Sequence, residues 1–298
     1  MKRILIARSA GFCFGVKRAI SIANETAGKA AGDEQGQGRF PIHSLGPLIH
    51  NPQAVEELEK KGVHVVESVD DIPCGKVIVR SHGITRSDGE ALAAKGVKII
   101  DATCPFVKKA QEYARSLSRE GYAVIVVGDA NHPEVKSIIS YIEAGVPTMT
   151  SLADLRESSG IRKAGIVAQT TQSFENLMEF VSVALKIIPE VRVYNTICHA
   201  TVLRQKESVA VATKADVMIV LGGYNSANTR RLAEICSEFN ARTRHIETAA
   251  ELSSDMLSGV SCAGVTAGAS TPEWIIEELV GRIRSIWKEE KIQVSYYQ

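Results

Sequence analysis

Short β-branched runs alternate along this chain with longer segments whose apolar residues recur at helical spacing. Three of these runs each precede a cysteine, at residues 3–7, 97–100 and 191–194. A helical segment follows each cysteine, with a clear period in the first two cases and a less regular one over 201–215. Cys13, Cys104 and Cys198 are therefore each predicted at a strand-to-helix junction.

The same order of elements repeats after each of these cysteines, which are separated by 91 and 94 residues. Two further strands are predicted in every copy, at 41–43 and 76–80, 123–129 and 165–168, and 217–223 and 262–266. Polar side chains follow these strands at matching distances from the cysteines: His43, His82, His132, Thr170, Ser226, Asn228 and Ser270. The repeat thus predicts that one set of polar side chains lies beyond the strand ends.

Strands that alternate with helices are typical of α/β proteins with parallel sheets, which bind ligands beyond the carboxyl ends of their strands. We expect three pseudo-symmetric α/β domains with small, mainly parallel sheets around a central site. Their predicted limits are 1–95, 96–190 and 191–298, the last with a C-terminal tail. The alternative is a single wide doubly wound sheet, which would scatter the three cysteines along one edge.

Composition fits a globular enzyme, with 45% hydrophobic and 23% charged residues. Lysine and arginine total 35 against 34 acidic residues, so a large basic field for nucleic acid is excluded. The apolar runs are far shorter than the roughly 20 residues of a membrane helix. The N-terminus lacks the apolar region of a signal peptide, so we expect a cytoplasmic protein without a membrane partner.

The three junction cysteines suit a metal centre better than a disulfide, which uses two. Zinc and an iron–sulfur cluster are both candidates. Because no fourth cysteine has a matching place in the repeat, we expect an open coordination position, as in a [4Fe–4S] cluster held by three cysteines. Cys74, Cys236 and Cys262 lie outside the junctions and are interpreted as core or incidental thiols.

The polar side chains after the strands predict an anion-binding site. A diphosphate is the ligand that best suits such donors beside helix N-termini. Glu134 adjoins this set in the segment Asn131-His-Pro-Glu134. If the site is catalytic, Glu134 is the best proton source. It could equally be a first-turn glutamate that interacts with the helix dipole, since Pro133 is suited to a helix start.

Several segments together resemble the 4-hydroxy-3-methylbut-2-enyl diphosphate reductases, also called IspH or LytB. The resemblance covers essentially the whole chain and rests on residues 10–19 (AGFCFGVKRA), 80–83 (RSHG), 101–105 (DATCP), 132–134 (HPE), 169–171 (QTT), 196–198 (TIC), 225–228 (NSAN) and 268–270 (GAS). It implies a trefoil-like fold around one [4Fe–4S] cluster, ligated by Cys13, Cys104 and Cys198. Ala227 stands where many members have a second serine, which removes one possible hydroxyl donor.

The resemblance also implies the last step of the methylerythritol phosphate pathway of isoprenoid synthesis. In this reductive dehydroxylation the allylic hydroxyl leaves with two electrons and two protons, giving isopentenyl and dimethylallyl diphosphate. Glu134 would supply protons through a network that includes Thr170, and Thr171 and Thr201 would line the pocket. The diphosphate would be held by His43, His82, His132, Ser226, Asn228 and Ser270.

Electrons are expected from a separate reduced ferredoxin or flavodoxin, because the sequence has no flavin or nicotinamide motif. Two other function classes remain open. A non-redox [4Fe–4S] hydro-lyase acting on a phosphorylated substrate would turn over without reductant. A plain electron carrier would have a fully ligated cluster and no use for the polar set.

Overall fold

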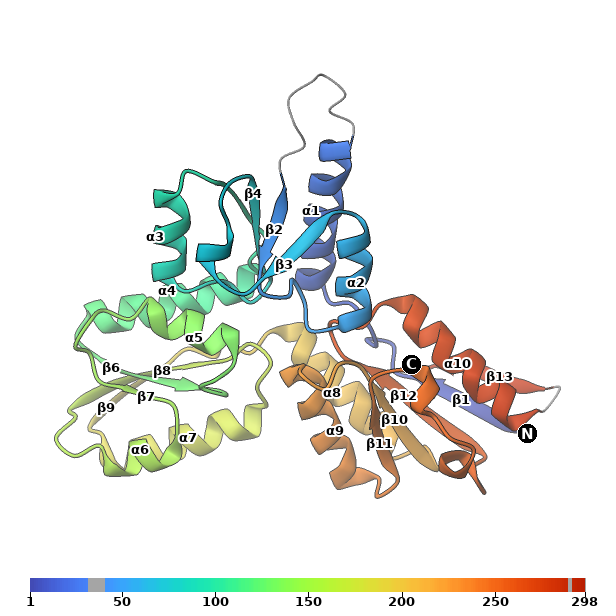
Figure 1. Cartoon of the computed structure of the whole chain (residues 1–298). Coiled ribbons are helices and arrows are strands. Elements are labelled where there is room, and N and C mark those ends of the chain that lie inside the picture. The colour runs from blue at the N-terminus through green and yellow to red at the C-terminus, as the bar shows by residue number, and fades with distance from the viewer. Residues whose placement is uncertain (32–40, 289–290, 298) are drawn as a thin grey trace. The chain divides into compact units, whose positions relative to one another are not determined.

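The computed structural model describes residues 1–31, 41–288 and 291–297. They form two compact units, the first made of Met1–Val16, His50–Ala54 and His199–Gln298, and the second of Lys17–Ile49 and Val55–Cys198. Three parallel sheets are found in the described part of the chain, one in the first unit and two in the second (Figure 1). The prediction of small parallel α/β sheets is confirmed, and the alternative of one wide sheet is wrong.

The first sheet of the second unit has the strand order β3-β2-β4-β5. Its strands are β2 (Ile42–Leu45), β3 (Val63–Val66), β4 (Lys76–Val79) and β5 (Lys98–Asp101), and the neighbouring helices are α1 (Phe14–Ala31), α2 (Pro52–Lys60), η1 (Val69–Asp71) and α3 (Arg86–Ala94). Val77 and Val79 of β4 pack with Leu92 of α3 in one apolar cluster. This packing fixes the carboxyl end of β4, from which His82 follows.

The second sheet of this unit has the order β7-β6-β8-β9. Its strands are β6 (Ala123–Val127), β7 (Thr148–Met149), β8 (Lys163–Ala168) and β9 (Glu190–Val193). Successive side chains of β6 alternate between two apolar clusters, because a strand points its side chains to opposite faces. One face is covered by α4 (Pro105–Arg119) and α5 (Pro133–Ser140), and the other by α6 (Leu152–Glu157) and α7 (Phe174–Ile187) (Figure 1).

The sheet of the first unit has the order β11-β10-β12-β1-β13. Its strands are β1 (Lys2–Ile6), β10 (Val217–Leu221), β11 (Thr243–Ile246), β12 (Cys262–Ala267) and β13 (Ile292–Tyr296). Side chains from α8 (His199–Ala212) and α9 (Ala227–Phe239) pack on one face. The other face is covered by α10 (Glu273–Trp287) together with η2 (Ala249–Glu251) and η3 (Asp255–Leu257).

In all three sheets the strand before a cysteine pairs with the third strand of another copy, and the sheet of the first unit has β13 as an additional strand. These pairs are β1 with β12, β5 with β4, and β9 with β8. The boundary predicted after residue 95 separates β5 from the sheet to which it hydrogen-bonds, and the boundary predicted after residue 190 falls within β9. The division of the chain into three domains at those residues stays a prediction.

No helix among the described residues has both the length and the apolar character needed to cross a bilayer.

Candidate functional site

Each of the three predicted junctions is present in the structure. Cys13 immediately precedes α1, Cys104 is the N-cap of α4, and Cys198 immediately precedes α8. Pro105 occupies the first turn of α4, where its missing N–H costs no hydrogen bond. All three cysteine side chains are partly exposed thiols at helix N-termini, where a metal could reach them.

The backbone around each cysteine is held by an equivalent hydrogen bond. The cysteine N–H donates to a carbonyl oxygen in the loop that follows the third strand of the adjoining sheet. The pairs are Cys13 to Ala269 at 3.2 Å, Cys104 to Ser81 at 3.0 Å and Cys198 to Thr170 at 3.0 Å. These bonds link each cysteine to a loop that carries a predicted polar residue, namely Ser270, His82 and Thr170.

The other three cysteines have different surroundings. Cys74 is exposed, and Cys236 and Cys262 are buried in the first unit. Burial raises the pKa of the Cys236 thiol to about 12, which disfavours a thiolate ligand. Burial likewise raises the pKa of Cys262. Cys236 packs in the apolar cluster formed with residues of α8 and α9, in agreement with its interpretation as a core residue.

Glu134 is almost fully buried, with 1% of its surface exposed, in the first turn of α5. Burial raises the pKa of its carboxyl to about 7, although hydrogen bonds from Thr170 oppose this shift. The backbone N–H of Thr170 donates to Oε1 at 2.6 Å, and the Thr170 hydroxyl also bonds the carboxyl. A carboxyl with such a pKa exchanges protons near neutral pH, as a general acid requires.

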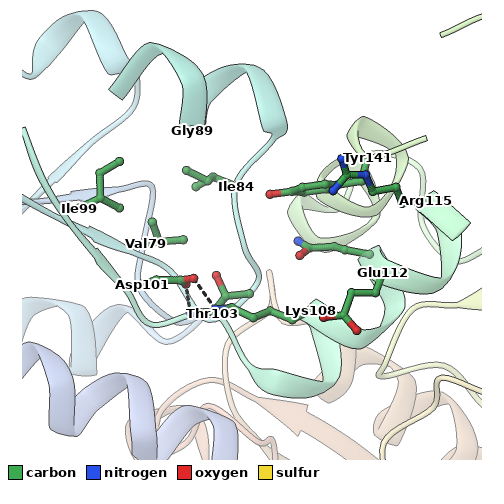
Figure 2. Close-up of a pocket in the computed structure, with 11 residues that line it drawn as sticks. Val79, Ile84, Gly89, Ile99, Asp101, Thr103, Lys108, Glu112, Arg115 and Tyr141 are labelled. Atoms are coloured by element: carbon green, nitrogen blue, oxygen red, sulfur yellow. Dashed lines mark hydrogen bonds and ion pairs between the residues drawn. The ribbon is translucent and has the colours of Figure 1, made fainter. Parts of the chain in front are cut away.

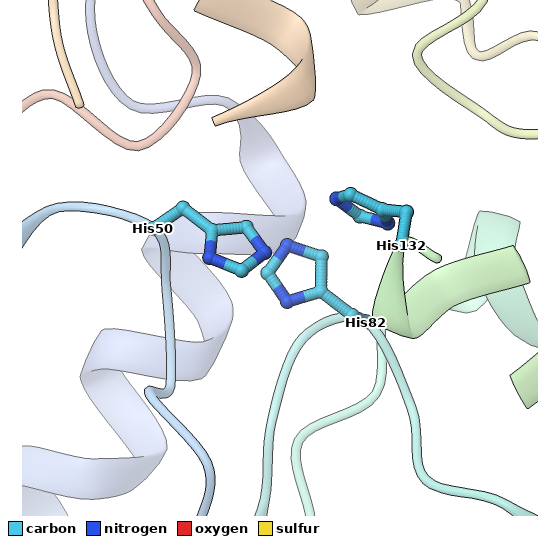
Figure 3. Close-up of side chains that lie close together, drawn as sticks. All are labelled: His50, His82 and His132. Carbon is cyan, nitrogen blue, oxygen red and sulfur yellow. The ribbon is translucent and has the colours of Figure 1, made fainter. Parts of the chain in front are cut away.

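His132 caps the helix on which Glu134 lies. Its Nδ1 accepts a hydrogen bond from the backbone N–H of Glu134 at 3.1 Å. An accepting Nδ1 carries no proton, so the ring proton of His132 is on Nε2, which can donate to an anion. The rings of His82 and His132 meet edge to face, with centroids 5.4 Å apart (Figure 3). The second unit thus brings Glu134, Thr170, His132 and His82 together; Figure 3 also labels His50, which belongs to the first unit.

His43 lies on β2, where it is paired in register with His64 of β3. Both ring nitrogens are buried, and neither has a hydrogen-bond partner among the described residues. Burial lowers the pKa of His43, and the charge of His64 lowers it further. An unsatisfied buried imidazole costs stability unless a ligand supplies the missing hydrogen bond.

The polar residues of the first unit cluster at the start of α9 and in the loop after β12. Ser226 is the N-cap of α9 and accepts a hydrogen bond from the N–H of Thr229 at 3.3 Å. Asn228 is buried, and its Nδ2 has no partner within the part of the chain that is described. Ser270 and Thr201, on the β12–α10 loop and on α8, are also buried.

The loop after β12 approaches the start of α9 closely, and this explains the glycine at position 268. A Cβ on Gly268, directly after β12, would lie 2.1 Å from Oγ1 of Thr229 in α9. Only glycine therefore lets the loop after β12 pack against the start of α9. The contact brings the segment that carries Ser270 close to the one that carries Ser226 and Asn228.

A cavity of about 340 Å³ is lined by residues of β4, β5, α3 and α4, by Thr103 in the turn before Cys104, and by Tyr141 directly after α5 (Figure 2). Asp101 forms an ion pair with Lys108 at 2.5 Å and accepts a hydrogen bond from the N–H of Thr103 at 2.9 Å. Burial opposes the ionisation of Asp101, but these bonds outweigh it and lower the pKa. The network braces the turn that carries Cys104, and the cavity contains none of the predicted site residues.

Gln169 is a buried polar residue beside Thr170 that the sequence analysis did not single out as a candidate. Its side chain is buried, and Oε1 accepts a hydrogen bond from the N–H of Asp129 at 3.2 Å. The Nε2 atom has no partner among the residues described. The signal was present in the sequence, because Gln169 directly follows the third strand of its copy and adjoins Thr170. Thr171, the next residue, is half-buried in the same loop.

Each unit, taken by itself, presents thiols of the kind that iron–sulfur clusters bind. The second unit offers Cys104 and Cys198, the first offers Cys13, and each thiol is at the same kind of junction. Soft thiolates are the ligands that iron–sulfur clusters use. The unsatisfied donors of His43 and Asn228 match the needs of an anionic guest.

A sequence profile of the family described as LytB protein matches residues 4–284. The chain belongs to the LytB family. Similar LytB proteins include the 4-hydroxy-3-methylbut-2-enyl diphosphate reductase of Pelobacter propionicus, 51% identical over 287 residues, which cover 96% of this chain and 99% of the relative. The reductase of Geobacter sulfurreducens is 50% identical over 288 residues, or 97% and 99% of the two chains.

Two solved LytB structures are similar to this one. The first is an (E)-4-hydroxy-3-methyl-but-2-enyl diphosphate reductase described as the terminal enzyme of the non-mevalonate pathway, 45% identical, with a TM-score of 0.69 and coverage of 96% of this chain and 100% of that one. The second, the corresponding reductase of Plasmodium falciparum, is 27% identical, with a TM-score of 0.89 and coverage of 99% and 92%. The α/β fold predicted from the resemblance is thereby confirmed.

Proposed function

We propose that this chain is a 4-hydroxy-3-methylbut-2-enyl diphosphate reductase that acts last in the non-mevalonate pathway. Relatives with about 50% identity over nearly the full length bear this name. The observation that carries the proposal is the buried Glu134 carboxyl, whose pKa of about 7 and contact with Thr170 suit proton delivery at a strand-end site. The hydro-lyase alternative is not favoured, because the relatives are named reductases.

We propose that Cys13, Cys104 and Cys198 hold one [4Fe–4S] cluster. The equivalent backbone hydrogen bonds of the three junctions support this assignment, since they position three thiols by the same local geometry. When bound, the cluster would supply electrons and a Lewis-acidic iron for the hydroxyl oxygen of the substrate. Cys236 is fully buried in an apolar cluster and is not part of the proposed ligand set.

The diphosphate is proposed to bind His43, His82, His132, Ser226, Asn228 and Ser270. His132 would donate from Nε2 while its Nδ1 stays bonded to the helix start. The buried donors of His43 and Asn228 would gain partners that the described residues do not provide. Thr171 and Thr201 are proposed to line the pocket around the rest of the substrate.

Glu134 is proposed to give a proton to the departing hydroxyl, which leaves as water when the allylic C–O bond breaks. Thr170 would hold the carboxyl in place through its N–H and pass protons through its hydroxyl. Two electrons and a second proton complete the reduction to isopentenyl or dimethylallyl diphosphate. The electrons are proposed to come from reduced ferredoxin or flavodoxin, and a cytoplasmic location remains a prediction.

An anaerobic turnover assay tests the proposal. The protein is reconstituted with iron and sulfide, mixed with 4-hydroxy-3-methylbut-2-enyl diphosphate, and analysed by mass spectrometry with and without dithionite and a viologen mediator. We expect isopentenyl and dimethylallyl diphosphate in the sample with reductant and unchanged substrate in the other. A dehydrated product formed without reductant would overturn the proposal in favour of a hydro-lyase.

A further inference from the structure

A buried arginine on α8 holds the loop that leads to Cys13. Arg204 is 3% exposed, and its Nη1 donates to the carbonyl oxygens of Ser9 at 2.6 Å and Gly11 at 3.0 Å. The same nitrogen donates to the carbonyl oxygen of Ala267, at the end of β12, at 3.1 Å. One guanidinium thus fastens the loop that carries Cys13 to the neighbouring strand.

The loop before Cys13 has further contacts with α8 and with the β12–α10 loop. Glu207, three residues after Arg204 on α8, accepts a hydrogen bond from the N–H of Ser9 at 2.7 Å. Gly11 adopts a φ of +94°, a conformation that L side chains rarely reach. The loop before Cys13 therefore makes a turn that requires glycine at position 11, and contacts from α8 hold this loop together with its own hydrogen bond to the β12–α10 loop.

An arginine at the matching place in another copy does the same for Cys104. Arg18 lies on α1, five residues after Cys13, as Arg204 lies six residues after Cys198. Its Nη1 donates to the carbonyl oxygen of Thr103 at 3.2 Å, and its Nη2 donates to that of Asp101 at 3.4 Å. Arg18 is half-buried and its bonds are longer, so its hold on the loop is weaker than that of Arg204.

The third junction uses an aromatic contact in the corresponding place. Tyr113 of α4 stacks on Tyr194, which lies four residues before Cys198, with ring centroids 4.0 Å apart and planes at 5°. In every copy, then, the helix that follows one cysteine contacts the loop that precedes another. Two of these contacts use a guanidinium, which can donate to several carbonyl oxygens at once.

We propose that Arg204 and Arg18 are positioning residues for the cluster ligands, Arg204 for Cys13 and Arg18 for Cys104. This inference rests on the proposed function, because positioning matters if these thiols bind iron. A guanidinium beside each loop fixes the direction of the thiol before metal binding, and such preorganisation lowers the cost of assembling the site. We therefore expect that replacing one arginine changes the position of one cysteine thiol and leaves the other cysteines unaffected.

The test measures the alkylation of each cysteine in the metal-free, reduced protein by a neutral reagent such as iodoacetamide. Mass spectrometry gives a rate for every cysteine, and a pH profile separates the accessibility of a thiol from its pKa. We expect Arg204→Gln to raise the pH-independent rate at Cys13 by about tenfold, with Cys104 unchanged. Arg18→Gln should raise the rate at Cys104 alone, by a smaller factor.

Controls distinguish positioning from general loss of structure. Cys236 is fully buried and reports unfolding by becoming reactive. Arg244→Gln is the matched substitution, since the exposed Arg244 donates to the carbonyl oxygen of Thr243 on the edge strand β11 and should leave all rates unchanged. Arg204→Lys keeps the charge without the planar guanidinium and should give a rate at Cys13 between those of wild type and Arg204→Gln.

A second readout uses the loaded protein under anaerobic conditions. Release of iron to a chelator should be about tenfold faster in Arg204→Gln and faster by a smaller factor in Arg18→Gln. Equal changes at Cys13 and Cys104 in both variants, or no change in either, would overturn the positioning roles. If Arg204→Gln makes Cys236 reactive, the test uses Arg204→Lys and Arg18→Gln instead. Each should then change the rate at its own cysteine alone. Failure of the wild-type protein to bind iron would instead contradict the proposed function and leave the alkylation result intact.

Discussion

Replacing Glu134 by glutamine should slow turnover and stabilise the protein at the same time. The amide keeps the size of the side chain and an oxygen that can accept from the N–H of Thr170, but it cannot release a carboxylic proton. General acid catalysis contributes about 10²–10⁴-fold, so single-turnover product formation should fall by that factor while the cluster and substrate binding persist.

The stability change follows from the pKa of about 7 in the folded chain against the ordinary 4.5. Below pH 4.5 the carboxyl is protonated in both states, and its ionisation does not affect folding. As the pH rises from 4.5 to 7, the unfolded chain ionises first, so stability is lost; above pH 7 the loss reaches about 3 kcal/mol. Glu134→Gln removes this penalty and should raise the melting temperature at pH 8 more than at pH 5.

Thermal unfolding of the metal-free protein at both pH values and single-turnover kinetics of the loaded protein test this reasoning. The matched control is Glu157→Gln, which changes an exposed glutamate on α6 of the same unit and should alter neither quantity. A role as a helix-start glutamate alone predicts a stability loss of about 1 kcal/mol or less and nearly normal turnover. Wild-type turnover in Glu134→Gln would refute the proton-donor role.

Three further outcomes are expected. Serine substitution of Cys13, Cys104 or Cys198 should abolish the iron content and the brown chromophore, whereas the same change at Cys74, Cys236 or Cys262 should retain both; an essential residue in the second set would contradict the ligand assignment. His43→Ala and Asn228→Ala should each weaken substrate binding by roughly one to two orders of magnitude, measured by anaerobic calorimetry on loaded protein, and unchanged affinity in both would remove the anion site. The turnover rate should decline as pH rises through about 7, because Glu134 loses its proton there, and a pH–rate profile that is flat between 6 and 8 would argue against it.

The repeat could be read from the sequence because strand ends in a parallel α/β fold are marked by abrupt changes from apolar to polar residues. All nine strands predicted by that change are present. His132 and Glu134 come after β6, and Thr170 comes after β8. The strands β3, β7, β11 and β13 were missed because each is a short strand at the edge of its sheet and carries polar residues. Which sheet each first strand joins was missed as well, since pairing between copies depends on long-range packing that local periodicity does not record.

Candidate site residues could be predicted where the residue type and its position relative to strands and helices point to the same role. Features that depend on tertiary contacts could not be predicted from the sequence. The cysteine junctions and Glu134 follow from position relative to strands and helix starts. The burial of Arg204 could not be predicted in this way, because an arginine on an irregular helix is usually exposed. Its hydrogen-bond acceptors also lie some 60 to 200 residues away along the chain. The raised pKa of Glu134 is likewise a product of packing around α5 that the sequence does not display.

The electron stoichiometry of turnover tests the central claim most directly. Reduced viologen consumed by the anaerobically reconstituted protein is titrated against the isopentenyl and dimethylallyl diphosphate formed from 4-hydroxy-3-methylbut-2-enyl diphosphate. The account predicts two electrons consumed for each product molecule, with no product when the viologen is oxidised. Loss of the hydroxyl without consumption of electrons would contradict it.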